Sequence, residues 1–482
     1  MSTSRSAVTR PSSSGPLTGN NPASALVPEN VEASDTSELP AYVPSTRSSS
    51  RSRRREFPEF KEFSYDAKNR KGKSVVILTV IAERSYSKHI PTFLQDSPVK
   101  GRVHLDLDKP ESILSVVLNI RGEYLTGANP DQQLIFLDLA YPLWSQSDGD
   151  PQRMNVLRET ESLTRQGSST LSARFNGPKL VGQYTWPFCI TLPKEVSVPY
   201  GKGKALRSFA LPQTFNERHA KGSIRYEISL RINRGRFQPN YRIPATIGYI
   251  PISRPPPFPP LRSMCYQEGT TLLGPTIDPD GWFSDTPVTI KGTIFSARAV
   301  HVTCTLCLAK PLCYTRGSVI PFFMRLESDD FQALDLLSNP KSISVSLQRR
   351  IKYHAFPEKV LGSFAKDSVE YVQQAVWWPS SEGVEVNVER FRFLNGELHL
   401  KADTKPSSAI ADFSIEYSVV LFPFKSAGFE ASDNGPLQTY PVEIVTSFAH
   451  GPRPRKYAPP GYDADTPPSM DFVNLDPVAY SS

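Results

Sequence analysis

Large apolar side chains occupy every second position of one stretch, residues 182–193, and this pattern is typical of a β-strand. The residues that share one face of this strand are Tyr184, Trp186, Phe188, Ile190 and Leu192. Burying each of these side chains is worth roughly 1.5–3 kcal/mol, so we expect the strand to pack against a second layer. Pro187 cannot donate a hydrogen bond to a neighbouring strand, which predicts a sheet edge or a bulge at this position.

The same period of two recurs along most of the chain. Residues 75–82 are apolar on both faces and predict a strand buried inside a sheet, whereas residues 99–107 and 222–235 alternate apolar with polar and predict strands with one face in solvent. Further strands are predicted at residues 114–120, 134–139, 288–294, 300–308, 318–326, 343–347, 384–388, 413–421 and 442–445. Many short strands separated by polar turns predict an all-β protein made of antiparallel, immunoglobulin-like β-sandwiches.

Helical periodicity is rare in this sequence. One short helix is predicted at residues 329–339, where acidic residues precede apolar residues at helical spacing and Asn339-Pro340 ends the pattern. Residues 145–170 are polar and have no clear period, so we interpret them as a long loop.

Proline-rich and serine-rich stretches set the expected domain boundaries. The chain has 482 residues, which is enough for two domains and two tails. The sequence P-I-S-R-P-P-P-F-P-P at residues 251–260 favours polyproline II and cannot join a sheet interior, which predicts a semi-rigid hinge. The expected parts are a disordered Ser/Pro/Arg-rich tail at 1–69, a first sandwich at 70–250, the hinge at 251–261, a second sandwich at 262–447 and a disordered tail at 448–482.

Charge and cysteine content narrow the functional classes. The net charge of +7 is small for this length and comes partly from one basic cluster, so no nucleic-acid partner is predicted. Five Cys residues are too few for a disulfide scaffold and favour a reducing compartment. The strongest apolar run, residues 75–82, is too short to cross a membrane, and the N-terminus lacks the apolar segment of a signal peptide.

The sequence predicts no catalytic residues, no metal site and no cofactor. Cys304-x-x-Cys307, followed by Cys313, has zinc-like spacing, but Cys304 and Cys307 differ in parity within a predicted strand and therefore point to opposite faces. We interpret these residues as buried thiols. Hydrolase, metalloprotease and nucleotide-binding motifs are absent, so no enzyme is predicted.

A P-P-x-Y motif in the C-terminal tail points to a partner. Two prolines hold polyproline II geometry at little entropic cost and fit the aromatic groove of a WW domain, while the tyrosine fills the adjacent pocket. The residues predicted to bind a WW domain are Pro459, Pro460 and Tyr462. A variant in the N-terminal tail, L-P-x-Y, supplies a second candidate ligand with Leu39, Pro40 and Tyr42.

A basic run precedes the first predicted strand. Residues 48–55 read S-S-S-R-S-R-R-R, and its candidate membrane-contact residues are Arg51, Arg53, Arg54 and Arg55. Contact with anionic lipid, nuclear import and phosphorylation of the neighbouring serines are three functional interpretations, and a solvated tail is the fourth.

Three stretches together resemble the arrestin superfamily, in particular the fungal α-arrestins. Residues 182–193 are similar to that family's G-x-Y-x-F/W-P-F-x-I-x-L-P strand. Residues 75–107 look like the opening strands of an arrestin N-domain, and residues 222–232 look like the strand that follows the motif. The resemblance covers about residues 70–250 and extends to 262–447 through the order of the strands.

The resemblance implies a non-catalytic adaptor. Family members bind membrane transporters or receptors through the arrestin fold and recruit HECT-type ubiquitin ligases through P-P-x-Y motifs, after which the cargo is ubiquitinated and endocytosed. Such an adaptor is expected in the cytoplasm, peripheral to the plasma membrane or endosomes. Of the family's functional residues, Pro459, Pro460 and Tyr462 have counterparts here. Two alternatives stay open: a retromer-like coat or sorting component, and a receptor-signalling scaffold that recruits no ligase.

Overall fold

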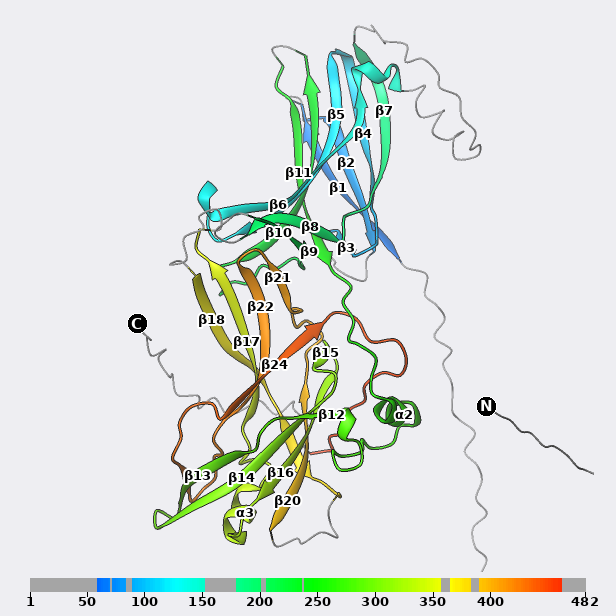
Figure 1. Ribbon diagram of the computed structural model, residues 1–482. Helices are drawn as coiled ribbons and strands as arrows, with labels where there is room; N and C mark the ends of the chain where they lie inside the picture. The colour runs from blue at the N-terminus through cyan, green and yellow to red at the C-terminus, as the bar shows by residue number, and fades with distance from the viewer. Residues whose placement is uncertain are drawn as a thin grey trace, which may run out of the picture. The chain divides into compact units, whose positions relative to one another are not determined.

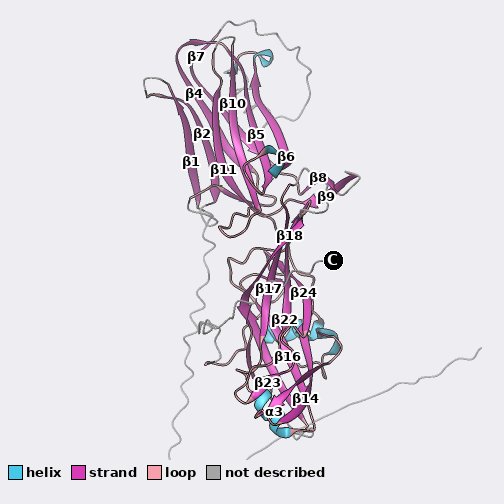
Figure 2. Ribbon diagram, turned by 90° about the vertical axis from the view of Figure 1, so that its left-hand side faces the viewer, coloured by secondary structure: helices cyan, strands magenta, loops and turns pink. Residues whose placement is uncertain are grey.

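The computed structural model describes residues 59–69, 72–83, 89–151, 179–200, 205–235, 238–356, 365–382 and 390–461. Strands make up most of this part of the chain, and helices are few and short (Figure 2). The predicted all-β class of two sandwiches is confirmed.

The first sandwich contains one sheet in the order β1-β2-β4-β7 and another in the order β3-β11-β10-β5-β6 (Figure 1). Its strands are β1 (Phe60–Lys68), β2 (Ser74–Glu83), β3 (Thr92–Leu94), β4 (Val99–Glu111), β5 (Ile113–Leu125), β6 (Gln133–Ser145), β7 (Leu180–Ile190), β10 (Ser223–Arg234) and β11 (Tyr241–Ile250). A separate hairpin pairs β8 (Glu195–Tyr200) with β9 (Ala205–Ala210). The 3₁₀ turns η1 (Pro130–Gln132) and η2 (Gln146–Asp148) flank β6.

The second sandwich has one sheet in the order β19-β20-β16-β14-β13-β23, with β12 on β14, and another in the order β15-β24-β22-β17-β18, with β21 on β22. Its strands are β12 (Trp282–Ser284), β13 (Val288–Ile294), β14 (Arg298–Ala309), β15 (Cys313–Thr315), β16 (Val319–Glu327), β17 (Val345–His354), β18 (Ala365–Gln374), β19 (Val376–Pro379), β20 (Phe391–His399), β21 (Ser408–Ile410), β22 (Phe413–Leu421), β23 (Phe429–Ala431) and β24 (Gln438–Val445). The helices are α2 (Pro260–Glu268), α3 (Phe331–Leu337) and the 3₁₀ turn η3 (Pro279–Gly281).

Strand β7 lies at a sheet edge, as Pro187 predicts. It pairs with β4 and stands at one edge of its sheet, so Pro187 removes no hydrogen bond from a second neighbour. The Trp186, Phe188 and Ile190 side chains are buried, and the Trp186 ring packs beside Trp144 of β6. The alternation in β7 therefore does give one core-facing surface.

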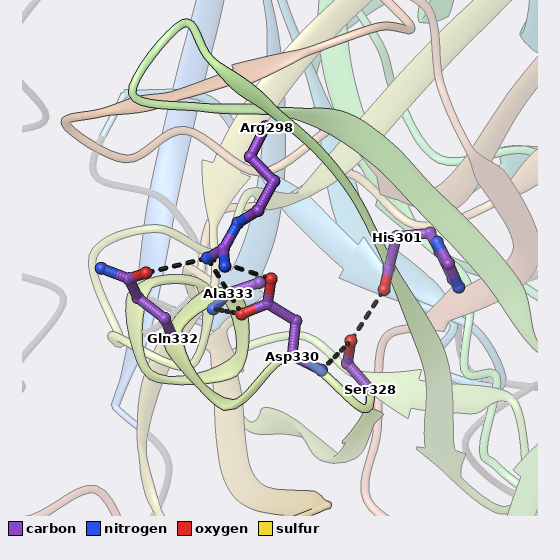
Figure 3. A network of polar contacts seen from close by, with 6 residues as sticks. All are labelled: Arg298, His301, Ser328, Asp330, Gln332 and Ala333. Atoms are coloured by element: carbon purple, nitrogen blue, oxygen red, sulfur yellow. Dashed lines mark hydrogen bonds and ion pairs between the residues drawn. The ribbon is translucent and has the colours of Figure 1, made fainter.

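Central strands also follow their patterns. Strand β2, apolar on both faces, lies between β1 and β4. In β10 every second residue from Ile224 to Ile232 is fully buried, and the residues between them are partly or fully exposed. The predicted helix at 329–339 is α3, whose N-cap Asp330 accepts a hydrogen bond from the Ala333 amide at 3.0 Å (Figure 3).

Two boundaries needed correction. Strand β1, at Phe60–Lys68, lies inside the segment assigned to the N-terminal tail, and it pairs with β2 along its length. Its Phe63, Tyr65 and Ala67 alternate with polar residues, so the period of two was present but short. Helix α2 was not expected at the end of the hinge. It begins at Pro260 and ends at Glu268, and the Gly269 that follows has a φ of 78°, the left-handed conformation that glycine adopts easily.

Aromatic and ionic contacts join the two sandwiches. The Phe413 ring of β22 packs against Tyr124 of β5 and against Phe215, with ring centroids 5.2 and 5.6 Å apart. Arg349 of β17 donates two hydrogen bonds to the Glu217 carboxylate at 3.0 and 2.6 Å. Buried residues of both sandwiches consequently belong to one continuous apolar cluster.

Candidate functional site

The motif predicted to bind a WW domain begins within the described part of the chain. Pro459 is half-buried, and Pro460 and Gly461 are exposed. Tyr462 lies outside the described residues. The other candidate residues, Leu39, Pro40, Tyr42, Arg51, Arg53, Arg54 and Arg55, also lie outside them.

The residues that precede the motif make defined contacts, although we expected disorder from residue 448. Residues 446–461, which we call the C-terminal strap, follow β24 directly. At the start of the strap, the Ser253 amide donates to Thr446 Oγ1 at 2.9 Å and the Ser447 amide donates to the Ser253 carbonyl at 2.9 Å. Thr446 Oγ1 also donates to the Pro251 carbonyl at 2.7 Å. The strap is thus joined to the linker between the sandwiches.

Glu397 of β20 holds the other end of the strap. Its side chain is 2% exposed, and its two carboxylate oxygens accept hydrogen bonds from the amides of Tyr457 at 2.7 Å and Ala458 at 3.3 Å. Nε2 of His399 lies 3.0 Å from Oε2 of the same carboxylate. Because a buried carboxylate needs hydrogen-bond partners to offset its lost hydration, strap and carboxylate stabilise each other here.

Aromatic contacts support this anchor. The Tyr457 ring stacks on Tyr266 of α2, with centroids 6.5 Å apart and planes 12° apart, and Phe258 meets Tyr266 edge-on at 5.3 Å. Burial raises the pKa of both Tyr266 and Tyr457, so both phenols stay neutral over the physiological range. The Tyr457 hydroxyl is buried and has no hydrogen-bond partner among the described residues.

The surface beneath the linker and α2 is the outer face of one sheet of the second sandwich. A small apolar cluster lies on this face, separate from the main core, and consists of Trp282, Cys307, Ala309 and Phe323. Arg262 of α2 lies over the Trp282 ring, 5.0 Å from its centroid, and donates to the carbonyls of Gly281 and Lys310. Helix α2 is therefore fixed to this face by packing and by hydrogen bonds.

Cys304, Cys307 and Cys313 are buried, as the sequence predicts. Cys304 belongs to the main core, whereas Cys307 belongs to the outer cluster, so these two residues of β14 do point to opposite faces. Burial raises the pKa of the Cys307 thiol to about 11 and that of Cys313 to about 12. Neither thiol is ionised enough near neutral pH to act as a nucleophile.

The space between the strap, α2 and the sandwich is too small for a small-molecule ligand. A cavity of about 10 Å³ is bounded by Phe258, Arg262, Tyr266, Tyr314 and Pro454, and it could hold a single water at most. Within the described ranges, no group of three potential metal ligands comes together. No helix of the described chain is long and apolar enough to cross a membrane.

Sequence reasoning missed the anchor itself. Glu397 alternates with the buried Leu394–Leu398 face of β20, and an acidic residue in that position usually faces solvent. It is buried because a segment about sixty residues later in the chain covers it. The sequence around Glu397 does not indicate such a contact. The proline after Tyr457-Ala458 favours an extended backbone there, but it does not indicate what that backbone contacts.

The described part of the chain thus forms two β-sandwiches joined by a proline-rich linker, with a proline pair after the second sandwich. Residues 83–246 match the family model described as arrestin (or S-antigen), N-terminal domain. A search of curated proteins found no match. The family match supports the arrestin superfamily and an arrestin-type adaptor or trafficking role, and arrestins are in general not catalytic. The fungal α-arrestin subtype stays a prediction.

Proposed function

We propose that this chain is an α-arrestin-type adaptor that recruits a HECT-type ubiquitin ligase to a membrane transporter or receptor. The cargo would bind the arrestin fold and be ubiquitinated and endocytosed at the plasma membrane or endosomes. The family match over residues 83–246 supports the adaptor part of this proposal. The P-P-x-Y sequence at 459–462 supports the ligase part.

The position of the motif carries the proposal. Its first three residues form the end of the C-terminal strap, which is tied to the second sandwich, and Pro460 and Gly461 are exposed there. The motif therefore lies close to the second sandwich and not at the end of a long tether. A short linear ligand has few contacts, so losing the tyrosine ring removes most of the affinity.

Calorimetry with purified WW domains tests this function. Tyr462→Ala should lose nearly all binding, while Tyr480→Ala, which removes the same ring from the same tail outside a P-P-x-Y sequence, should bind as the wild type does. Tyr42→Ala should have a smaller effect, visible as lost avidity with tandem WW domains. Circular dichroism would confirm that the variants fold. Undiminished binding by Tyr462→Ala would favour the retromer-like coat or the scaffold instead.

In the same proposal, the basic run at residues 48–55 contacts anionic lipid at the membrane surface. Each basic residue near an anionic surface contributes about 1 kcal/mol, so Arg51, Arg53, Arg54 and Arg55 would together favour the cytoplasmic leaflet. Co-sedimentation should be stronger with anionic than with neutral vesicles, and should weaken as salt is added. Equal binding to both kinds of vesicle would leave the run as a solvated tail.

A further inference from the structure

The proposed ligase motif starts one residue after the strap's last tie to the sandwich. The Ala458 amide is bonded to the Glu397 carboxylate, and Pro459 is the next residue. Hydrogen bonds to an ionised acceptor are among the strong ones, and this acceptor is 2% exposed. The stacked Tyr457 and Tyr266 rings add a second contact at the same place.

Part of the motif in the anchored strap differs from the free polyproline II segment that a WW domain binds. A WW domain binds the two prolines in polyproline II, with their rings exposed to the domain. Polyproline II has φ within about 20° of −75°. Pro459 is half-buried, and Gly461 has φ 94°, outside the polyproline II region. Binding therefore requires the chain to move at both ends of the Pro459–Gly461 segment.

We infer that the Glu397 anchor restrains the ligase motif, so that a WW domain binds it fully only after Tyr457 and Ala458 leave the sandwich. This inference rests on the proposed function, because it concerns the regulation of the same motif. The intact protein then alternates between an anchored strap, which binds WW domains poorly, and a released strap, which binds them well. The apparent dissociation constant equals the intrinsic one divided by the released fraction. Any partner that releases the strap would raise affinity for the ligase.

The test compares the full chain with a synthetic peptide of residues 452–470, which contains the motif but not Glu397. Both are titrated with the same purified WW domain. The peptide should bind about tenfold more tightly than the full chain, since a few hydrogen bonds and one ring stack must first be broken in the protein. In the full chain Glu397→Gln, whose amide cannot accept both backbone bonds as a carboxylate does, the affinity should approach that of the peptide.

Two substitutions at one residue provide a matched pair. Tyr457→Ala removes the ring stack and should also raise the affinity of the full chain. Tyr457→Phe keeps the ring and removes a buried hydroxyl that no described residue hydrogen-bonds, so its full chain should bind as weakly as the wild type or more weakly. Each substitution is also placed in the peptide, which separates its effect on the anchor from any direct effect on the WW domain. Thermal melts would show that the variants remain folded.

The outcomes separate the inference from the function on which it rests. If the wild-type peptide does not bind the WW domain, the proposed function fails. If the peptide binds and the full chain binds equally well, with no gain from Glu397→Gln or Tyr457→Ala, the motif is a ligand but the anchor does not restrain it. A tighter peptide, with both variants closing the gap, supports the inference.

Discussion

The two sandwiches share an architecture but differ in what covers their sheets. In the first, strands such as β7 and β10 bury one face and leave the other largely polar. In the second, β14 and β16 are buried on both faces over much of their length, because the main core covers one side and the outer cluster around Trp282 covers the other. The linker, α2 and the C-terminal strap lie over that second side.

This difference explains where the motif is held. A sheet with a polar outer face needs no cover, whereas an apolar outer face must be shielded from water. The segment that shields it here also leads to the Pro459-Pro460 pair. In the second sandwich, the segment that stabilises the fold consequently also fixes the position of the proline pair. The match to the arrestin family model lies in the first sandwich.

Thiol reactivity should give the largest contrast between the sandwiches. Cys189 of the first sandwich is exposed, whereas Cys265, Cys304, Cys307 and Cys313 of the second are buried. Ellman's reagent at pH 8 should therefore modify one thiol quickly in the native protein and all five after denaturation. Rapid reaction of two or more thiols in the native state would show that the outer face is not shielded. Cys189→Ser, which should abolish the fast phase, is the control.

The first sandwich should depend strongly on its organising strand. Trp186 is 2% exposed and lies beside the Trp144 and Tyr184 rings. Trp186→Ala should lower the free energy of unfolding by roughly 3–5 kcal/mol, the usual effect of removing a buried aromatic ring. Urea unfolding followed by circular dichroism measures this loss. Cys189→Ser, three positions further along the same strand and exposed, should leave the midpoint almost unchanged.

Two equally buried tryptophans give a finer comparison. Trp144 in the first sandwich donates its indole N–H to the Gly149 carbonyl at 2.9 Å, whereas the indole N–H of Trp377 in the second has no partner among the described residues. Replacing either by Phe removes similar volume, but only Trp144→Phe breaks a hydrogen bond. Trp144→Phe should therefore destabilise by about 1 kcal/mol more than Trp377→Phe, measured by urea unfolding. The opposite order would mean that Trp377 has a partner in solution.

The cap of α3 should give the smallest of these effects. Asp330 accepts from the Ala333 amide and pairs with Arg298 at 3.1 Å (Figure 3). Asp330→Ala should lower the stability of the second sandwich by about 1 kcal/mol, the usual loss for an N-cap. Asp329→Ala, which removes an exposed partner of Arg390, should change it much less. Equal losses in differential scanning calorimetry would mean that the cap bond is not formed.

Strands with one buried face were predictable from the sequence because a period of two records directly which face meets the core. Strands β4, β7 and β10 show this clearly. Strand β1 has only Phe63, Tyr65 and Ala67 in the pattern, next to an arginine-rich tail, so composition there favours the tail over a strand.

The candidate site was predictable only in part. The proline pair could be recognised because its chemistry is local, whereas Glu397 and Tyr457 meet through the fold and are about sixty residues apart. Helix α2 had a proline at its start and a glycine at its end, but the prolines before it favoured an extended hinge. Local patterns therefore identified the ligand motif and did not identify what holds it.

Reconstituted ubiquitination tests the central claim most directly. The purified chain is incubated with ubiquitin, activating and conjugating enzymes and a HECT-type ligase that carries WW domains, and conjugates are followed by immunoblot. The account predicts that the wild type and Tyr480→Ala are ubiquitinated at similar rates and that Tyr462→Ala is modified at least about tenfold more slowly, because one of two ligand pockets is left empty. Equal rates for wild type and Tyr462→Ala would contradict the account.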